Sequence, residues 1–120
     1  MALNKKTQKI GMAVGDVKAG GTIHKYRLVK LSAYNTIVET TSAAVAVGVV
    51  LEDYAEGDTA TYYSHSIVPV ECSAAIAIGA KVSADSNGKA VTTSSTNFVV
   101  GICVEATAAA GDIAMVQLVV

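Results

Sequence analysis

An internal repeat constrains this chain more than any other feature, because a duplicated segment is expected to fold twice in the same way. A glycine, a run of apolar residues and a glutamate at 48–52 recur at 101–105. Each copy leads through an alanine-containing segment to a Gly-Asp pair, Gly57-Asp58 or Gly111-Asp112. The first glycines lie 53 residues apart and the Gly-Asp pairs 54 apart, so the second copy has one extra residue. Two units of about fifty residues are too few for a solenoid, and we expect two intertwined halves of one small domain.

The rest of the chain carries the signals of short strands and tight turns. Residues 59–70 are rich in Thr, Tyr, Ile and Val, which favour strands, and Pro69 within them indicates a sheet edge or a bulge. Asn87-Gly88 predicts a tight hairpin. Only alanine-rich segments such as 74–78 and 108–110 could form a helical turn, and a glycine soon follows each. We predict an all-β fold, a small β-barrel or β-sandwich built from two pseudo-repeats of about fifty residues, with at most one or two short helical turns.

The N-terminal segment differs from the rest in composition. We expect residues 1–10 to form a flexible basic arm and residues 11–120 to form a single all-β domain. The arm holds Lys5, Lys6 and Lys9, a third of the basic residues in the chain. It is either a solvated tail or an arm that becomes ordered on a partner with negative charge.

The balance of charged and apolar residues points to an assembled protein. Charged residues make up only 16% of the chain and hydrophobic residues 52%, which leaves a free monomer little with which to cover its surface. The longest charge-free apolar run, 43–51, is well short of the roughly 18 residues of a membrane helix. A net charge of −1 argues against electrostatic binding to nucleic acid. We therefore expect an oligomer or a lattice-bound protein, with neither a membrane nor a nucleic acid as partner.

Residues able to support catalysis or hold a metal are isolated from one another. Neither Cys72 nor Cys103 lies in a C-x-x-C pair or beside a histidine, and we expect two reduced, buried thiols, with a disulfide as the alternative. Glu52 and Glu105 occupy equivalent repeat positions, and repetition explains them more simply than acid–base catalysis. Gly88-Lys89 lacks the earlier glycine and the following Ser or Thr of a phosphate loop. We predict no enzymatic activity, no cofactor and no metal site.

Three tyrosines, Tyr54, Tyr62 and Tyr63, lie close together in a chain with no Trp and one Phe. Tyrosine is enriched at protein interfaces because it offers both apolar area and a hydroxyl group. Tyr62 and Tyr63 are adjacent, so in a strand they point to opposite faces, and at most one can enter the core of a single sheet packing. The region is predicted to be an interface, with ordinary strand packing as the alternative.

These motifs together resemble a family of short tailed-bacteriophage head proteins, the capsid decoration or cement proteins. Members are sometimes mislabelled as RecA/RadA-like recombinases, a label that the failed phosphate-loop motif does not support. The order and spacing of the motifs carry the resemblance, in segments 18–21, 28–31, 47–58, 78–82, 87–89 and 100–112.

The resemblance implies a structural virion protein that binds the outer surface of the expanded phage head and stabilises the capsid lattice. The expected partners are the major capsid protein and other copies of the chain, most often in a trimer, after synthesis in the cytoplasm of the bacterial host. Lys5, Lys6 and Lys9 would belong to a capsid-binding arm, which matches no family motif, and Tyr54, Tyr62 and Tyr63 to an oligomer or capsid interface. The alternative is a surface recognition module that binds glycan or the host envelope.

Overall fold

The computed structural model describes residues 12–42, 44–94 and 97–120, which form strands and turns without a helix. Among these residues, then, there is no helix that could cross a membrane. The all-β prediction is confirmed. In chain order the strands are β1 (Met12–Ala19), β2 (Leu28–Ala33), β3 (Thr36–Glu39), β4 (Gly48–Val49), β5 (Thr59–Ser64), β6 (Ile67–Glu71), β7 (Lys81–Ala84), β8 (Ala90–Thr92), β9 (Gly101–Glu105) and β10 (Ile113–Leu118).

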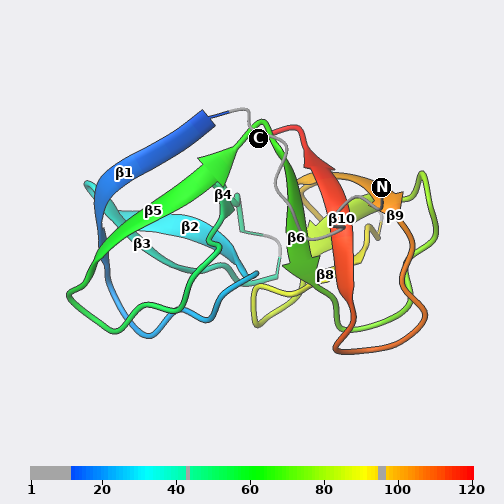
Figure 1. Cartoon of the computed structure of the whole chain (residues 1–120), viewed down its shortest axis with the longest axis horizontal. Coiled ribbons are helices and arrows are strands. Elements are labelled where there is room, and N and C mark those ends of the chain that lie inside the picture. The colour runs from blue at the N-terminus through cyan, green and yellow to red at the C-terminus, as the bar shows by residue number, and fades with distance from the viewer. Residues whose placement is uncertain (1–11, 43, 95–96) are drawn as a thin grey trace, which may run out of the picture.

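The strands form two units that lie side by side along the long axis of the molecule (Figure 1). The N-terminal unit, β1 to β5, is a closed barrel in the order β1-β3-β2-β4-β5. It closes because β1 pairs in parallel with β3 and antiparallel with β5. Small and β-branched side chains fill this narrow barrel, namely Val17, Ala19, Ile23, Val29, Ile37, Val50 and Ala60.

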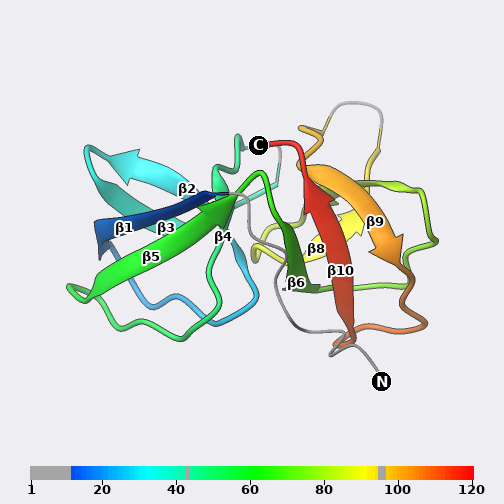
Figure 2. The ribbon, with the colours of Figure 1, turned by 45° about the horizontal axis from the view of Figure 1, so that its top comes forward.

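The C-terminal unit, β6 to β10, repeats this topology as a five-stranded sheet in the order β6-β10-β9-β7-β8. Where β1 and β3 pair in the first unit, the second has only the parallel bridge between Cys72 and Ala90. Pro69 lies in β6, at the edge of the sheet, as its missing N–H predicted. The two pseudo-repeats are confirmed, but the expectation of intertwined halves is wrong for the described strands, since each pairs only within its own unit (Figure 2).

The repeated glycine marks the place where two strands approach most closely in each unit. A Cβ added at Gly48 would lie 2.3 Å from the carbonyl oxygen of Tyr63, and one added at Gly101 would lie 2.3 Å from that of Gln117. Only a residue without a Cβ therefore lets β4 pack against β5, and β9 against β10. This explains why the glycine is present in both copies.

The Gly-Asp pairs close equivalent turns. Gly57 and Gly111 have φ values of 91° and 88°, in the left-handed region that favours glycine. The carboxylate of Asp58 accepts a hydrogen bond from the amide of Ala55 at 2.8 Å. That of Asp112 accepts two, from residues 108 and 109, both at 3.1 Å. The extra residue of the second copy thus lies in this turn, where the longer loop offers one more amide to the same carboxylate.

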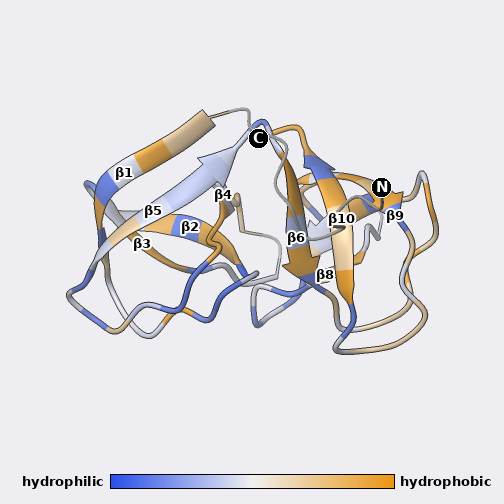
Figure 3. Ribbon diagram, in the orientation of Figure 1, coloured by the Kyte–Doolittle hydropathy of each residue, from blue (hydrophilic) through white to orange (hydrophobic). Residues whose placement is uncertain are grey.

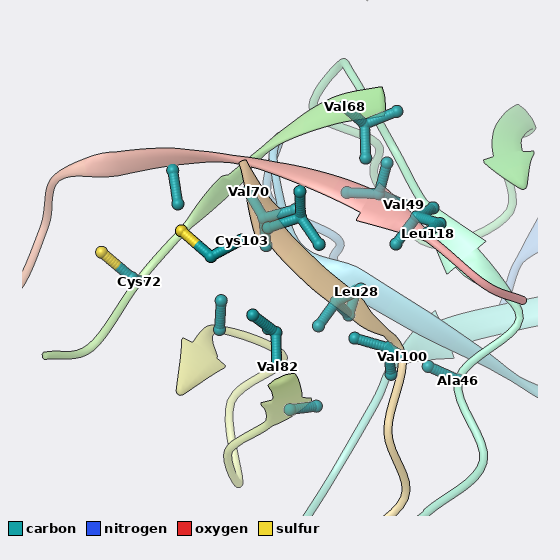
Figure 4. Packing of buried hydrophobic residues seen from close by; sticks show 14 of the residues in the cluster. Leu28, Ala46, Val49, Val68, Val70, Cys72, Val82, Val100, Cys103 and Leu118 are labelled. Atoms are coloured by element: carbon teal, nitrogen blue, oxygen red, sulfur yellow. The ribbon is translucent and has the colours of Figure 1, made fainter. Parts of the chain in front are cut away.

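The two units share part of one hydrophobic core. Leu28, Ala46 and Val49 of the N-terminal unit belong to the buried cluster formed mainly by the C-terminal unit. Figure 4 shows them beside Val68 and Val100 in this cluster. Separating the units would expose these side chains to water, at a cost of roughly 25 cal/mol per Å² of apolar surface.

We predict that Gly48→Ala and Gly101→Ala will each lower the free energy of unfolding by about 2–3 kcal/mol, because the added methyl group collides with backbone that has no room to move. Urea unfolding followed by circular dichroism measures the change. Gly21→Ala is the matched control, since a Cβ there meets nothing within 4 Å. Equal stabilities for all three variants would contradict the close strand approach.

Candidate interaction surfaces

Besides the shared core, the two units are joined through residues 26–28 of the N-terminal unit, which insert between β6 and the tip of the β7–β8 hairpin. The Glu71 amide donates to the Tyr26 carbonyl at 2.9 Å, and the Leu28 amide donates to the Gly88 carbonyl at 2.8 Å. We call this contact the seam. In the N-terminal unit the equivalent residues bond to each other, with the Lys18 amide donating to the Asn35 carbonyl at 2.8 Å. The inserted segment therefore explains why one unit is a closed barrel and the other an open sheet.

Gly88 is the residue that lets the hairpin enter the seam. Its φ is +75°, and an added Cβ would lie 2.8 Å from the Leu28 carbonyl oxygen. The Asn-Gly pair predicted the hairpin, and the structure adds that Gly88 in its tip is buried against the other unit, whereas Ser86 and Asn87 are exposed. The close approach and the left-handed backbone both require glycine here.

Charged side chains surround the seam and link the two units. The Arg27 guanidinium lies 3.4 Å from one carboxylate oxygen of Glu71, whose other oxygen lies 3.3 Å from the Lys89 ammonium. The Arg27 guanidinium also lies 3.6 Å from the Glu39 carboxylate. This carboxylate accepts a hydrogen bond from the His24 backbone amide at 2.8 Å and lies 2.6 Å from Nδ1 of the His24 ring. The Arg27 side chain is only 13% exposed, so water screens these pairs less than surface ion pairs. Every group in the network has a charged partner, which indicates a structural role.

The three predicted tyrosines are half-buried and contribute to both cores. Tyr54 and Tyr62 pack against the N-terminal core, whereas Tyr63 packs against the shared cluster. The Tyr54 hydroxyl accepts a hydrogen bond from the Thr61 amide at 3.2 Å. Tyr62 and Tyr63 thus point to opposite faces of β5, as the alternation predicted, and the structure adds that each face meets a different core. Their place at an interface stays a prediction, and Lys5, Lys6 and Lys9 lie outside the described residues.

Sequence reasoning missed the large apolar side chains that are most exposed. Tyr34, at the tip of the β2–β3 hairpin, is 97% exposed, and Ile78, in the loop before β7, is 69% exposed. The alanine-rich segments around residues 74–78 and 108–110 are loops without a helical turn, and all of these residues except the buried Ile76 are exposed. Comparing the two repeat copies position by position would have singled out Ile78 and the alanine-rich segments, since their counterparts in the first copy include Lys25 and Glu56.

In the described residues, side chains able to support catalysis or bind a metal ion are scattered or engaged in structural contacts. The described part of the chain contains no group of three or more His, Cys, Asp or Glu that could hold a metal ion. Cys72 and Cys103 are buried free thiols. Burial raises the pKa of the Cys103 thiol, so this group stays protonated at neutral pH.

Comparison with known proteins agrees with this picture of a tandem all-β protein. The family model described as phage cement protein matches residues 14–118. The chain belongs to the phage cement protein family. The match spans both units of the chain.

A solved structure has the same fold. The head fiber gp8.5 N base in bacteriophage phi29 superposes with a TM-score of 0.73 over 89% of this chain and 94% of that one, at 21% sequence identity. At this identity the likeness shows the fold alone. A search of curated proteins finds no match.

We predict that Gly88→Ala will be less stable than Gly57→Ala by at least about 1 kcal/mol. Both glycines have positive φ, but a Cβ at Gly57 meets nothing within 4 Å, whereas one at Gly88 meets the Leu28 carbonyl. Both variants share the cost of alanine at positive φ, so the difference between their thermal unfolding curves reports the contact of residue 88 with Leu28 in the seam. Hydrogen exchange at the Leu28 amide should be faster in Gly88→Ala alone, and equal exchange in both variants would be evidence against the inserted segment.

Proposed function

We propose that this cement protein binds the outer surface of the phage head and stabilises the capsid lattice. The observation that carries the proposal is the family match over nearly the whole described chain. The structure supports it in two ways. The shared core and the seam make the two units suited to act as one body, which could bridge neighbouring capsid subunits. The catalytic and metal-ligating residue types in the described segments are isolated or occupied by structural contacts.

The proposed mechanism is binding alone, without catalysis. Each copy makes modest contacts, and repetition over a symmetric lattice converts them into high avidity, because every contact raises the effective concentration of the next. The partners are the major capsid protein and other copies of this chain, in a small oligomer such as a trimer. Residues 11–120 act as one body in this proposal and residues 1–10 as its arm.

Two regions are proposed to make these contacts. Lys5, Lys6 and Lys9 give the arm a positive charge, suited to an acidic groove on the capsid. The half-buried tyrosines Tyr54, Tyr62 and Tyr63 leave part of each side chain accessible for a partner. Their rings are held by the two cores, so little conformational entropy would be lost when they bind.

The experiment that tests the arm is co-sedimentation of the purified protein with expanded heads that lack it. We expect saturable binding at a simple ratio to the capsid subunit. Changing Lys5, Lys6 and Lys9 together to Gln should weaken it at least about tenfold, because three charge contacts are lost. The same three residues changed to Arg serve as the control and should bind as the unaltered protein does. Full binding by the Gln variant would remove the arm from the proposal, and no binding by the unaltered protein would turn attention to glycan and cell-surface ligands.

The tyrosines are tested in the same assay with phenylalanine, which keeps the ring in its core while removing the hydroxyl group. Tyr62→Phe and Tyr63→Phe should keep the thermal midpoint of the unaltered protein and lose several-fold in head binding or in oligomer stability, because hydrogen bonds to a partner are lost. Unchanged oligomer mass together with unchanged head binding would return these residues to a purely structural role.

A further inference from the structure

The seam joins a segment of the N-terminal unit to a hairpin of the C-terminal unit, and the repeat equivalents of these two surfaces make no such contact between the units. Inside the molecule, residues 26–28 of the N-terminal unit contact the β7–β8 hairpin of the C-terminal unit. The repeat places an equivalent segment at 79–81 and an equivalent hairpin tip at 34–35, each displaced by 53 residues. This free segment and this free hairpin lie at opposite ends of the long axis in both views (Figures 1 and 2).

The free end of the C-terminal unit has lost the charges that its N-terminal counterpart carries. Loops 73–80 and 106–111 contain no charged residue, whereas the equivalent loops 20–27 and 53–57 contain His24, Lys25, Arg27, Asp53 and Glu56. We call loops 73–80 and 106–111 the alanine-rich end, and Figure 3 shows their more hydrophobic colouring.

The same backbone bridge holds both pairs of loops. It joins Ile23 to Tyr54 in the N-terminal unit and Ile76 to Thr107 in the C-terminal unit. Because the fold is the same, it does not demand the apolar composition of the alanine-rich end. An exposed apolar surface that the fold does not require indicates a binding surface.

The free hairpin offers a matching apolar group on a rigid support. Tyr34 is 97% exposed and Leu31, on the same hairpin, is 52% exposed. The tip is fixed to β1, because the Asn35 side-chain amide donates to the Asp16 carbonyl at 2.7 Å and its carbonyl accepts from the Lys18 amide. Because the backbone of the tip is held in this way, binding would have to order the Tyr34 side chain but not the loop that carries it.

We propose that copies of this protein associate head to tail, with Tyr34 and Leu31 of one copy packed on Ile78 and Val104 of the next. Val104 belongs to this end because its neighbour Cys103 exchanges backbone hydrogen bonds with residues 79 and 80. The contact uses the repeat equivalents of the two seam surfaces but does not copy the insertion, because the hydrogen bond from the Lys18 amide to the Asn35 carbonyl closes the gap that receives residues 26–28 in the other unit. The counterparts of Arg27 and Glu71 are Ala80 and Lys18, so the ion pair of the seam has no equivalent and apolar packing takes its place.

Such a contact is heterologous, since it joins two different surfaces. It generates a closed ring if the rotation between copies closes, and an open chain otherwise. This head-to-tail contact rests on the proposed function, in which copies of the chain bind one another, and it specifies the two surfaces that meet. It can fail while head binding holds, because its test contains no heads.

The test is sedimentation velocity of the unaltered protein, Tyr34→Asp and Ile78→Asp across micromolar concentrations. Each substitution should raise the dissociation constant at least about tenfold, because a carboxylate would be buried without a partner. Val45→Asp is the matched control, since Val45 is 62% exposed but lies on neither surface, and it should sediment like the unaltered protein.

Mixing the two variants gives the sharper result. Tyr34→Asp keeps an intact alanine-rich end and Ile78→Asp keeps an intact hairpin, so an equimolar mixture should form a dimer although each variant alone is monomeric. An unaltered protein that stays monomeric, a variant that keeps the full oligomer mass, or a mixture that stays monomeric would each overturn the head-to-tail contact.

Discussion

The structure depends on the insertion of residues 26–28 between β6 and the β7–β8 hairpin. Two backbone hydrogen bonds join this segment to the other unit, and Leu28 within it is fully buried in the core that the other unit mainly forms. Tyr26 has a φ of 64° where its counterpart Gly79 has 83°. A tyrosine in this left-handed region is strained, and the contacts of the seam offset that strain. Two similar units thereby become one body with different ends.

The residues that repeat give both units the same framework, and the residues that differ between the copies make the two ends of the molecule different. The glycines at 48 and 101 and the Gly-Asp turns are required by strand contact and turn geometry in both units. At other positions the copies differ, with Arg27 opposite Ala80, Leu28 opposite Lys81 and Tyr34 opposite Asn87. These positions lie at the seam or at the two free ends, where the contacts between units are made or left open.

The sequence was sufficient for the fold class, because glycines, turns and apolar strands recur at a fixed separation and each has a local physical cause. It predicted the Asn87-Gly88 hairpin and the edge position of Pro69 for the same reason. It could not predict the seam, since contacts between Leu28 and Gly88 depend on how two units pack and leave no periodic pattern. Tyr34 was missed because a lone aromatic residue in a turn resembles any other loop residue until its exposure is known.

The measurement that tests the central claim most directly is a cryo-EM comparison of expanded heads with and without the protein. The account predicts difference density on the outer surface, in a fixed ratio to the capsid subunits, that accommodates both units in the arrangement of Figure 1. Density on the inner face, the absence of added density, or density that fits only if the two units are separated would contradict it.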